Sequence, residues 1–160
     1  KLIYSNYWRA TRGHASGYQR TAPPWLQHHQ LMAFANPIPM LTACVRAELV
    51  KKSRFEAIHH EDFVFWYLIT QQLQSHEVKI VAQPLALYSV NPKSLSGNKL
   101  ISTVWIWKCY RSLGYSIIKS LIAIILRSLL QCWYMTNSLN KQSIPFDSAD
   151  IEQRWLNGVR

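Results

Sequence analysis

The sequence predicts an α/β fold, and three observations point to this class. Apolar residues make up 49% of the 160-residue chain, with seven Trp and eight Tyr, which is typical of a domain with a real core and argues against disorder. Short strand-like stretches alternate with segments whose apolar residues recur at three- and four-residue steps. Pro, Gly and Asn residues separate these segments, as they do at turns.

The first half of the chain predicts two strands and two helices. Aromatic residues favour an N-terminal strand. Pro23-Pro24 suits the first turn of a helix, and Asn36-Pro37 ends it because a residue before proline avoids the helical region. The expected elements are a strand over 2–8, a polar loop over 9–21, a helix over 25–34, a strand over 40–45 and a helix over 46–52.

The second half predicts the longest helices. Glu61-Asp62 opens one of them, where the helix dipole favours negative charge, and Gly114 stops another. The expected elements are a helix over 61–74, extended stretches over 78–82 and 84–90, a loop over 91–98, a helix ending at 113, a helix over 117–135 and a polar tail with a short helix over 148–156.

Charge and cysteine content limit the partners. The formal net charge is +10, which favours an anionic partner such as a membrane surface or a phosphorylated substrate. The basic residues are scattered and form no basic arm, so we expect no nucleic-acid binding. Three cysteines without metal-ligand spacing predict reduced, mostly buried thiols in the cytosol.

Residues 117–135 form the most apolar segment. Lys119 and Arg127 interrupt it, which disfavours a membrane-spanning helix. On a helical wheel it is amphipathic, so it predicts either contact with a membrane surface or packing on the protein's own core. The polar side carries Ser116, Lys119, Ser120, Arg127, Ser128 and Gln131. The apolar side carries Ile118, Leu121, Ile122, Ile125, Leu126, Leu129 and Trp133.

Residues 59–62, His-His-Glu-Asp, are the clearest candidate for chemistry. A carboxylate at a helix start near aromatic walls can act as a general base. The alternative is an acidic pair that only caps the helix. Four adjacent side chains cannot converge on one ion, and no HExxH pattern occurs, so no metal site is expected here.

The order of several short motifs resembles the C-terminal half of family-2 glycosyltransferases with the GT-A (Rossmann-like) fold. The resemblance covers about residues 2–111. The matching pieces are Asn36, residues 42–49, Phe55, Glu61-Asp62 followed by Trp66, Pro84-Leu85-Ala86 with Tyr88, and Ser94 with Ser96.

The resemblance implies an inverting sugar transferase. Asp62 would be the catalytic base and Glu61 would help to orient the acceptor. The other substrate-binding positions would be Asn36, Trp66, Tyr88, Asn91 and Ser94. The donor would be a nucleotide sugar, the acceptor a glycan or lipid-linked glycan, and the cofactor Mg²⁺ or Mn²⁺. The resemblance further implies polysaccharide biosynthesis by a cytoplasmic enzyme that is peripheral at the inner face of the cell membrane.

The sequence departs from the family pattern in three places. Ser89 and Asn91 stand where an Arg and a His are common, and Ser53-Arg54 replaces a Gly. No Asp-x-Asp metal motif occurs, so we expect the donor-binding half and most metal ligands to lie outside this chain, and these residues alone not to turn over.

Three regions follow from this interpretation. They are an acceptor-side half domain over 1–113, an amphipathic helix over 114–136 and a polar tail over 137–160. The alternative function is a non-enzymatic membrane-surface or interaction module that uses the amphipathic helix.

Overall fold

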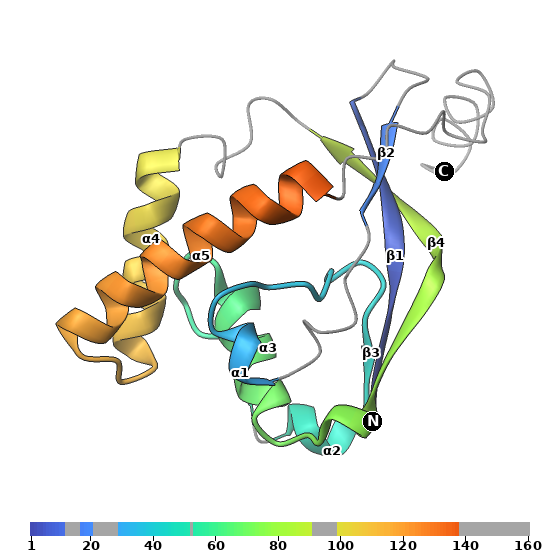
Figure 1. Cartoon of the computed structure of the whole chain (residues 1–160). Coiled ribbons are helices and arrows are strands. Elements are labelled where there is room, and N and C mark those ends of the chain that lie inside the picture. The colour runs from blue at the N-terminus through green and yellow to red at the C-terminus, as the bar shows by residue number, and fades with distance from the viewer. Residues whose placement is uncertain (12–16, 21–28, 52, 91–98, 138–160) are drawn as a thin grey trace.

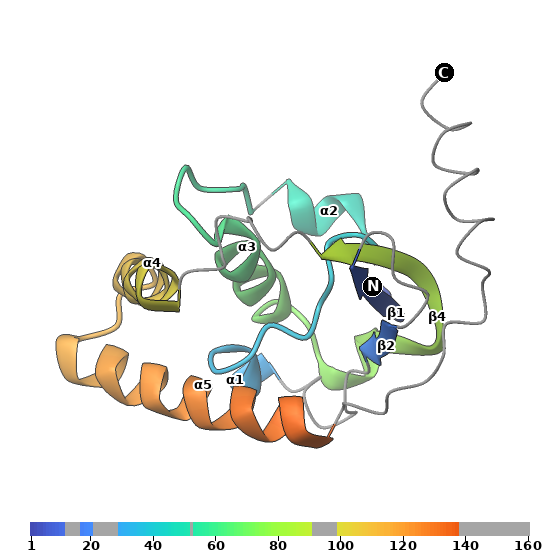
Figure 2. The same cartoon turned by 90° about the horizontal axis from the view of Figure 1, so that it is seen from above.

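The structure, a computed structural model, describes residues 1–11, 17–20, 29–51, 53–90 and 99–137. It is mixed α/β, which confirms the predicted class at that level. A small sheet stands at one side of the molecule and the helices lie beside it (Figure 1). Seen from above, the long helix α5 runs along one side of the helical layer and α3 lies inside it (Figure 2).

The sheet is built around one strand, β1. Its neighbours are β4, which runs parallel to it, and β2 and β3, which pair antiparallel with its two ends. The strands are β1 (Leu2–Thr11), β2 (Gly17–Arg20), β3 (Cys44–Val45) and β4 (Val78–Val90). The expected N-terminal strand is confirmed and is longer than predicted.

Two strand predictions were wrong. The segment 9–21 was expected to be a loop, but it contains β2 and the end of β1. These two stretches form an antiparallel pair, in which their backbone groups hydrogen-bond to each other. The two stretches separated at Pro84 form the single strand β4. Its register against β1 shifts beside Pro84, and the side-chain amide of Asn6 donates to the Ala82 carbonyl at 2.7 Å. Such a bulge accommodates a residue that has no N–H to donate.

The helices follow the predicted order, but the one expected over 61–74 is shorter and the one expected over 117–135 ends later, at Asn137. They are α1 (His29–Met32), α2 (Ala47–Val50), α3 (Glu61–Thr70), the 3₁₀ helix η2 (Ser75–Glu77), α4 (Lys99–Ser112) and α5 (Ile117–Asn137). Much of the strand expected over 40–45 is turn. The helix expected over 148–156 lies outside the described residues.

Helix α3 is buried on both sides and joins two apolar clusters. Phe65, Trp66 and Ile69 pack toward the sheet with Leu2 and Tyr4. Phe63 and Val64 pack on the other side, with Ile106, Tyr110 and Ala123 from α4 and α5. A helix that is apolar all round is expected to be central in a fold.

The turn between α4 and α5 depends on a glycine. Gly114 has φ of 81°, and the Tyr115 N–H donates to the Tyr110 carbonyl at 3.0 Å, which closes the end of α4. Ser116 then accepts a hydrogen bond from the Lys119 N–H at 3.3 Å and so caps α5. The predicted stop at Gly114 is confirmed.

Helix α5 meets the core through a narrow stripe that contains Ser120, Ala123 and Arg127. Ser120 and Ala123 are buried and Arg127 is half-buried, whereas the residues of the predicted apolar side are exposed. This differs from the usual arrangement, in which the apolar stripe covers the core. Among the described residues, no helix combines the length and the apolar character that crossing a bilayer requires.

The cysteines differ from expectation. All three are free, but only Cys109 is buried, while Cys44 and Cys132 are exposed. Burial raises the pKa of the Cys109 thiol to about 11, so this thiol stays neutral. The prediction of mostly buried thiols was wrong because Cys44 lies on a short strand and Cys132 on the outer side of α5.

Candidate active site

Asp62 lies in the first turn of α3, at the centre of the molecule. It is half-buried, whereas its neighbour Glu61 is exposed. The amide Nδ2 of Asn36 donates to Asp62 Oδ2 at 3.0 Å. Asn36 comes from the segment after α1, so the structure brings together two site residues that are 26 positions apart in the sequence.

Asn36 is itself held in place. Its Oδ1 accepts a hydrogen bond from the Ile38 N–H at 3.3 Å, across Pro37. This local turn fixes which end of the amide faces Asp62. The second carboxylate oxygen, Oδ1 of Asp62, makes no hydrogen bond with the described residues. The carboxylate is therefore positioned by one oxygen and has the other available to accept a proton.

Helix α4 supports the segment that leads into Asp62. The His59 ring stacks on Trp105, with ring centroids 3.9 Å apart, and His60 Nε2 lies 3.0 Å from the Ser102 hydroxyl. The Cys109 thiol donates to the His59 carbonyl at 3.2 Å. These contacts hold His60 in the left-handed region, with φ of 61°, which turns the chain into α3.

His60 is neutral in the folded protein at neutral pH. Burial lowers the pKa of His60 below its ordinary value, outweighing the opposite effect of the Asp62 carboxylate. The Arg127 guanidinium contributes further to this lowering of the pKa.

Arg127 brings α5 to the same region. Its guanidinium lies 4.9 Å from the centre of the ring of Phe63, the residue that directly follows Asp62. Sequence reasoning placed Arg127 only on a polar helix face and did not assign Ser102, Trp105 or Cys109 to the site. Their spacing along α4, at positions 102, 105 and 109, was a usable signal because it places them on one side of a helix.

Tyr88 belongs to a second group, on the sheet. Its ring meets Tyr7 at a centroid distance of 6.3 Å, and the Arg9 guanidinium lies 5.3 Å from the Tyr88 ring centre. Within the described residues, no hydrogen bond or ring contact joins this group to Asp62. Asn91 and Ser94, predicted to bind substrate, lie outside the described residues.

Trp66 lies one turn after Asp62 and points into the core. It is 2% exposed and packs in the apolar cluster between α3 and the sheet. Its indole Nε1 is buried and has no hydrogen-bond partner among the described residues.

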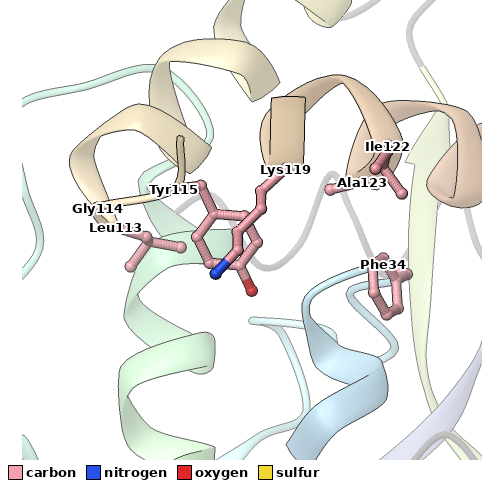
Figure 3. A pocket seen from close by; sticks show the side chains of 7 residues that line it. All are labelled: Phe34, Leu113, Gly114, Tyr115, Lys119, Ile122 and Ala123. Carbon is pink, nitrogen blue, oxygen red and sulfur yellow. The ribbon is translucent and has the colours of Figure 1, made fainter. Parts of the chain in front are cut away.

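A pocket of about 440 Å³ lies beside the α4–α5 turn (Figure 3). Its walls include Phe34, two residues before Asn36, and Tyr115, whose hydroxyl lies 3.4 Å from that of Tyr67. The Lys119 side chain extends from α5 and lines the same pocket as Tyr115 (Figure 3). The pocket is thus apolar with one amine at its edge.

The described residues do not form a metal site. No group of three His, Cys, Asp or Glu side chains converges in this part of the chain. The carboxylates of Glu61 and Asp62 are the nearest acidic pair, but Glu61 is exposed and Asp62 is turned toward Asn36. The sequence predicts that most ligands of the Mg²⁺ or Mn²⁺ lie outside this chain; this stays a prediction, and no step proposed below passes through the metal.

The described residues therefore form a mixed α/β fold in which a hydrogen bond from Asn36 holds the Asp62 carboxylate at the start of α3. Searches against protein-family models, curated proteins and solved structures found no match to this chain.

Proposed function

We propose that this chain is the acceptor-side part of an inverting family-2 glycosyltransferase with a GT-A fold, and that Asp62 is its general base. The observation that carries the proposal is the Asn36–Asp62 hydrogen bond, which fixes a half-buried carboxylate at the start of α3. These are two of the positions that the ordered motifs assign to the site. Positioning of this kind supplies much of the rate in transfer reactions.

In the proposed reaction, an acceptor hydroxyl oxygen attacks the anomeric carbon of a nucleotide sugar. The bond from that carbon to the diphosphate oxygen breaks, and the nucleoside diphosphate leaves. The hydroxyl proton passes to Asp62 Oδ1 as the new glycosidic bond forms. Glu61, which is exposed at the same helix start, would help to orient the acceptor. The configuration at the anomeric carbon inverts because a single displacement occurs.

The donor would be a nucleotide sugar and the acceptor a glycan or a lipid-linked glycan. Polysaccharide biosynthesis at the cytoplasmic face of the cell membrane is the proposed setting. Support for an anionic surface or substrate comes from the net charge of +10. Mg²⁺ or Mn²⁺, if used, would bind ligands supplied mostly by the donor-binding half.

The test is Asp62→Asn in the full-length enzyme that includes the donor-binding half. Transfer from a panel of nucleotide sugars should fall by at least about 10²-fold, since a positioned base contributes that much or more. Donor affinity, measured by calorimetry, should stay within about twofold because the carboxylate faces the acceptor.

The matched control is Glu56→Gln, which neutralises an exposed carboxylate outside the site. It should leave transfer unchanged. Full transfer by Asp62→Asn, with folding confirmed by circular dichroism, would remove Asp62 as the base and with it this proposal.

A further inference from the structure

The outer side of α5 is a continuous apolar surface that no described residue covers. Its large side chains are between 40% and 70% exposed. They recur at three- and four-residue steps and so lie along one side of the helix. We call this surface the α5 face, and it consists of Ile117, Ile118, Leu121, Ile122, Ile125, Leu126, Leu129 and Trp133.

The orientation of α5 is set from its inner side. Ser120 is fully buried and its hydroxyl donates to the Ser116 carbonyl at 2.9 Å, while Ala123 packs between α3 and α4. Arg127 lies over Phe63. Rotating α5 to bury the α5 face would remove these contacts and expose the apolar groups they cover. The exposed stripe is therefore a feature of the packed helix.

The charge of the segment around the α5 face indicates which kind of partner covers that face. Between residues 99 and 137 the chain has Lys99, Lys108, Arg111, Lys119 and Arg127 but no Asp or Glu. Lys108, Arg111 and Lys119 are exposed. A second copy would bring a second net charge of +10 to the contact, which opposes self-association. An anionic surface is attracted by the same residues.

Shape favours a lipid surface over a protein partner with a groove. Helix α5 runs along one side of the helical layer (Figure 2), and the exposed side chains of the α5 face project from the surface of this single helix and do not line a groove. A helix of 21 residues is about 30 Å long and can lie flat in the interface. Trp133, near its C-terminal end, suits the headgroup layer because its ring is both apolar and polar.

We propose that the α5 face docks on an anionic lipid bilayer, with α5 lying in the plane of the interface. Apolar side chains enter the boundary between headgroups and acyl chains, and the exposed Lys108 and Lys119 side chains pair with anionic headgroups. This docking does not depend on the proposed glycosyltransferase activity.

The experiment is vesicle flotation of the 160-residue chain. Vesicles of phosphatidylcholine alone are compared with an equimolar mixture of phosphatidylcholine and phosphatidylglycerol. Binding to the anionic vesicles should be at least about tenfold tighter, since anionic headgroups attract basic residues that lie near the membrane surface. Added salt should weaken it.

The variant Ile125→Ser with Leu129→Ser removes two apolar groups from the α5 face. Affinity for anionic vesicles should fall by at least about tenfold, as expected for losing buried apolar area. Ile118→Ser with Leu121→Ser tests the other end of the face and keeps the test valid if the first pair lowers stability. The matched control, Met40→Ser with Leu85→Ser, changes exposed apolar groups elsewhere and should bind like the wild type.

Three outcomes would overturn the proposal. The wild type does not float with anionic vesicles; the α5-face variants and the control bind equally well; or sedimentation equilibrium shows a dimer that only the α5-face variants dissociate, which would assign the face to a second copy. Asp62→Asn should bind vesicles like the wild type, so failure of docking and failure of the proposed catalysis are separate results.

Discussion

At residue 62, the orientation of the carboxylate depends on one neighbour, Asn36. Asn36 donates to one oxygen of Asp62 and is itself fixed by the Ile38 N–H. An amide can donate to the carboxylate without adding charge, so it orients Asp62 and leaves it able to take up a proton. The same position occupied by a lysine or arginine would lower the basicity that a general base requires.

Removal of the Asn36 amide should cost stability in this chain. Asn36→Ala should lower the free energy of unfolding by about 1–2 kcal/mol, because a half-buried carboxylate loses its donor and the Ile38 N–H loses its acceptor. Chemical denaturation monitored by circular dichroism measures this. Glu56→Ala, an exposed change, should stay within about 0.5 kcal/mol.

Asn36→Asp separates charge from shape. At about pH 7 it should destabilise more than Asn36→Ala, because two carboxylates then lie together. The repulsion raises a carboxyl pKa in the folded state, so the folded protein binds more protons and the deficit should shrink as the pH falls toward about 4. A deficit that does not change with pH would show that the two side chains are not adjacent.

At the scale of elements, α5 is the informative helix. Its sequence alone gives an apolar side and a polar side, but not which side meets the protein. The inner side carries Ser120 and Ala123, which are small enough to pack over Phe63 and Tyr110, and the Arg127 guanidinium lies across the Phe63 ring. The larger apolar residues then face outward.

Two adjacent substitutions test this orientation. Ser120→Ile fills a fully buried position and should destabilise by about 1–3 kcal/mol through overpacking. Leu121→Ser, at a half-exposed position, should change stability by about 0.5 kcal/mol or less. Thermal unfolding of both variants decides the matter, and the opposite ranking would mean that α5 packs through its apolar side.

At the scale of the whole molecule, burial of His60 links the fold to pH. Its pKa is lowered from 6.5 mainly by burial, so the unfolded chain binds more protons than the folded one once the pH drops below that value. The contribution of His60 to stability should therefore be constant above about pH 6.5 and should fall between this pH and the lowered folded pKa of His60.

His60→Asn should remove this part of the pH dependence. Asn tolerates the left-handed backbone at position 60 and does not titrate. Denaturant unfolding from about pH 7 down to about pH 5 measures the slope. His76→Asn, at an exposed position, should keep the wild-type slope. An unchanged slope in His60→Asn would mean that burial of His60 does not set it.

The sequence by itself determined the local features of this protein. Apolar periodicity gave the order of the helices, glycine gave the stop at Gly114, and the Glu61-Asp62 pair marked the start of α3. These signals could be read because each depends on neighbouring residues in the chain. The motif order also brought Asn36 and Asp62 into one prediction, and the structure places them in contact.

Only the tertiary structure decided features that depend on distant residues. β2 exists because it pairs with β1, and β4 continues through Pro84 because Asn6 bonds the bulge. The side of α5 that faces the core was decided by the space left beneath it. Ser102, Trp105 and Cys109 join the site because α4 packs against His59 and His60. When two segments far apart in the chain pair or pack together, neither segment carries a periodic pattern of apolar residues that names its partner.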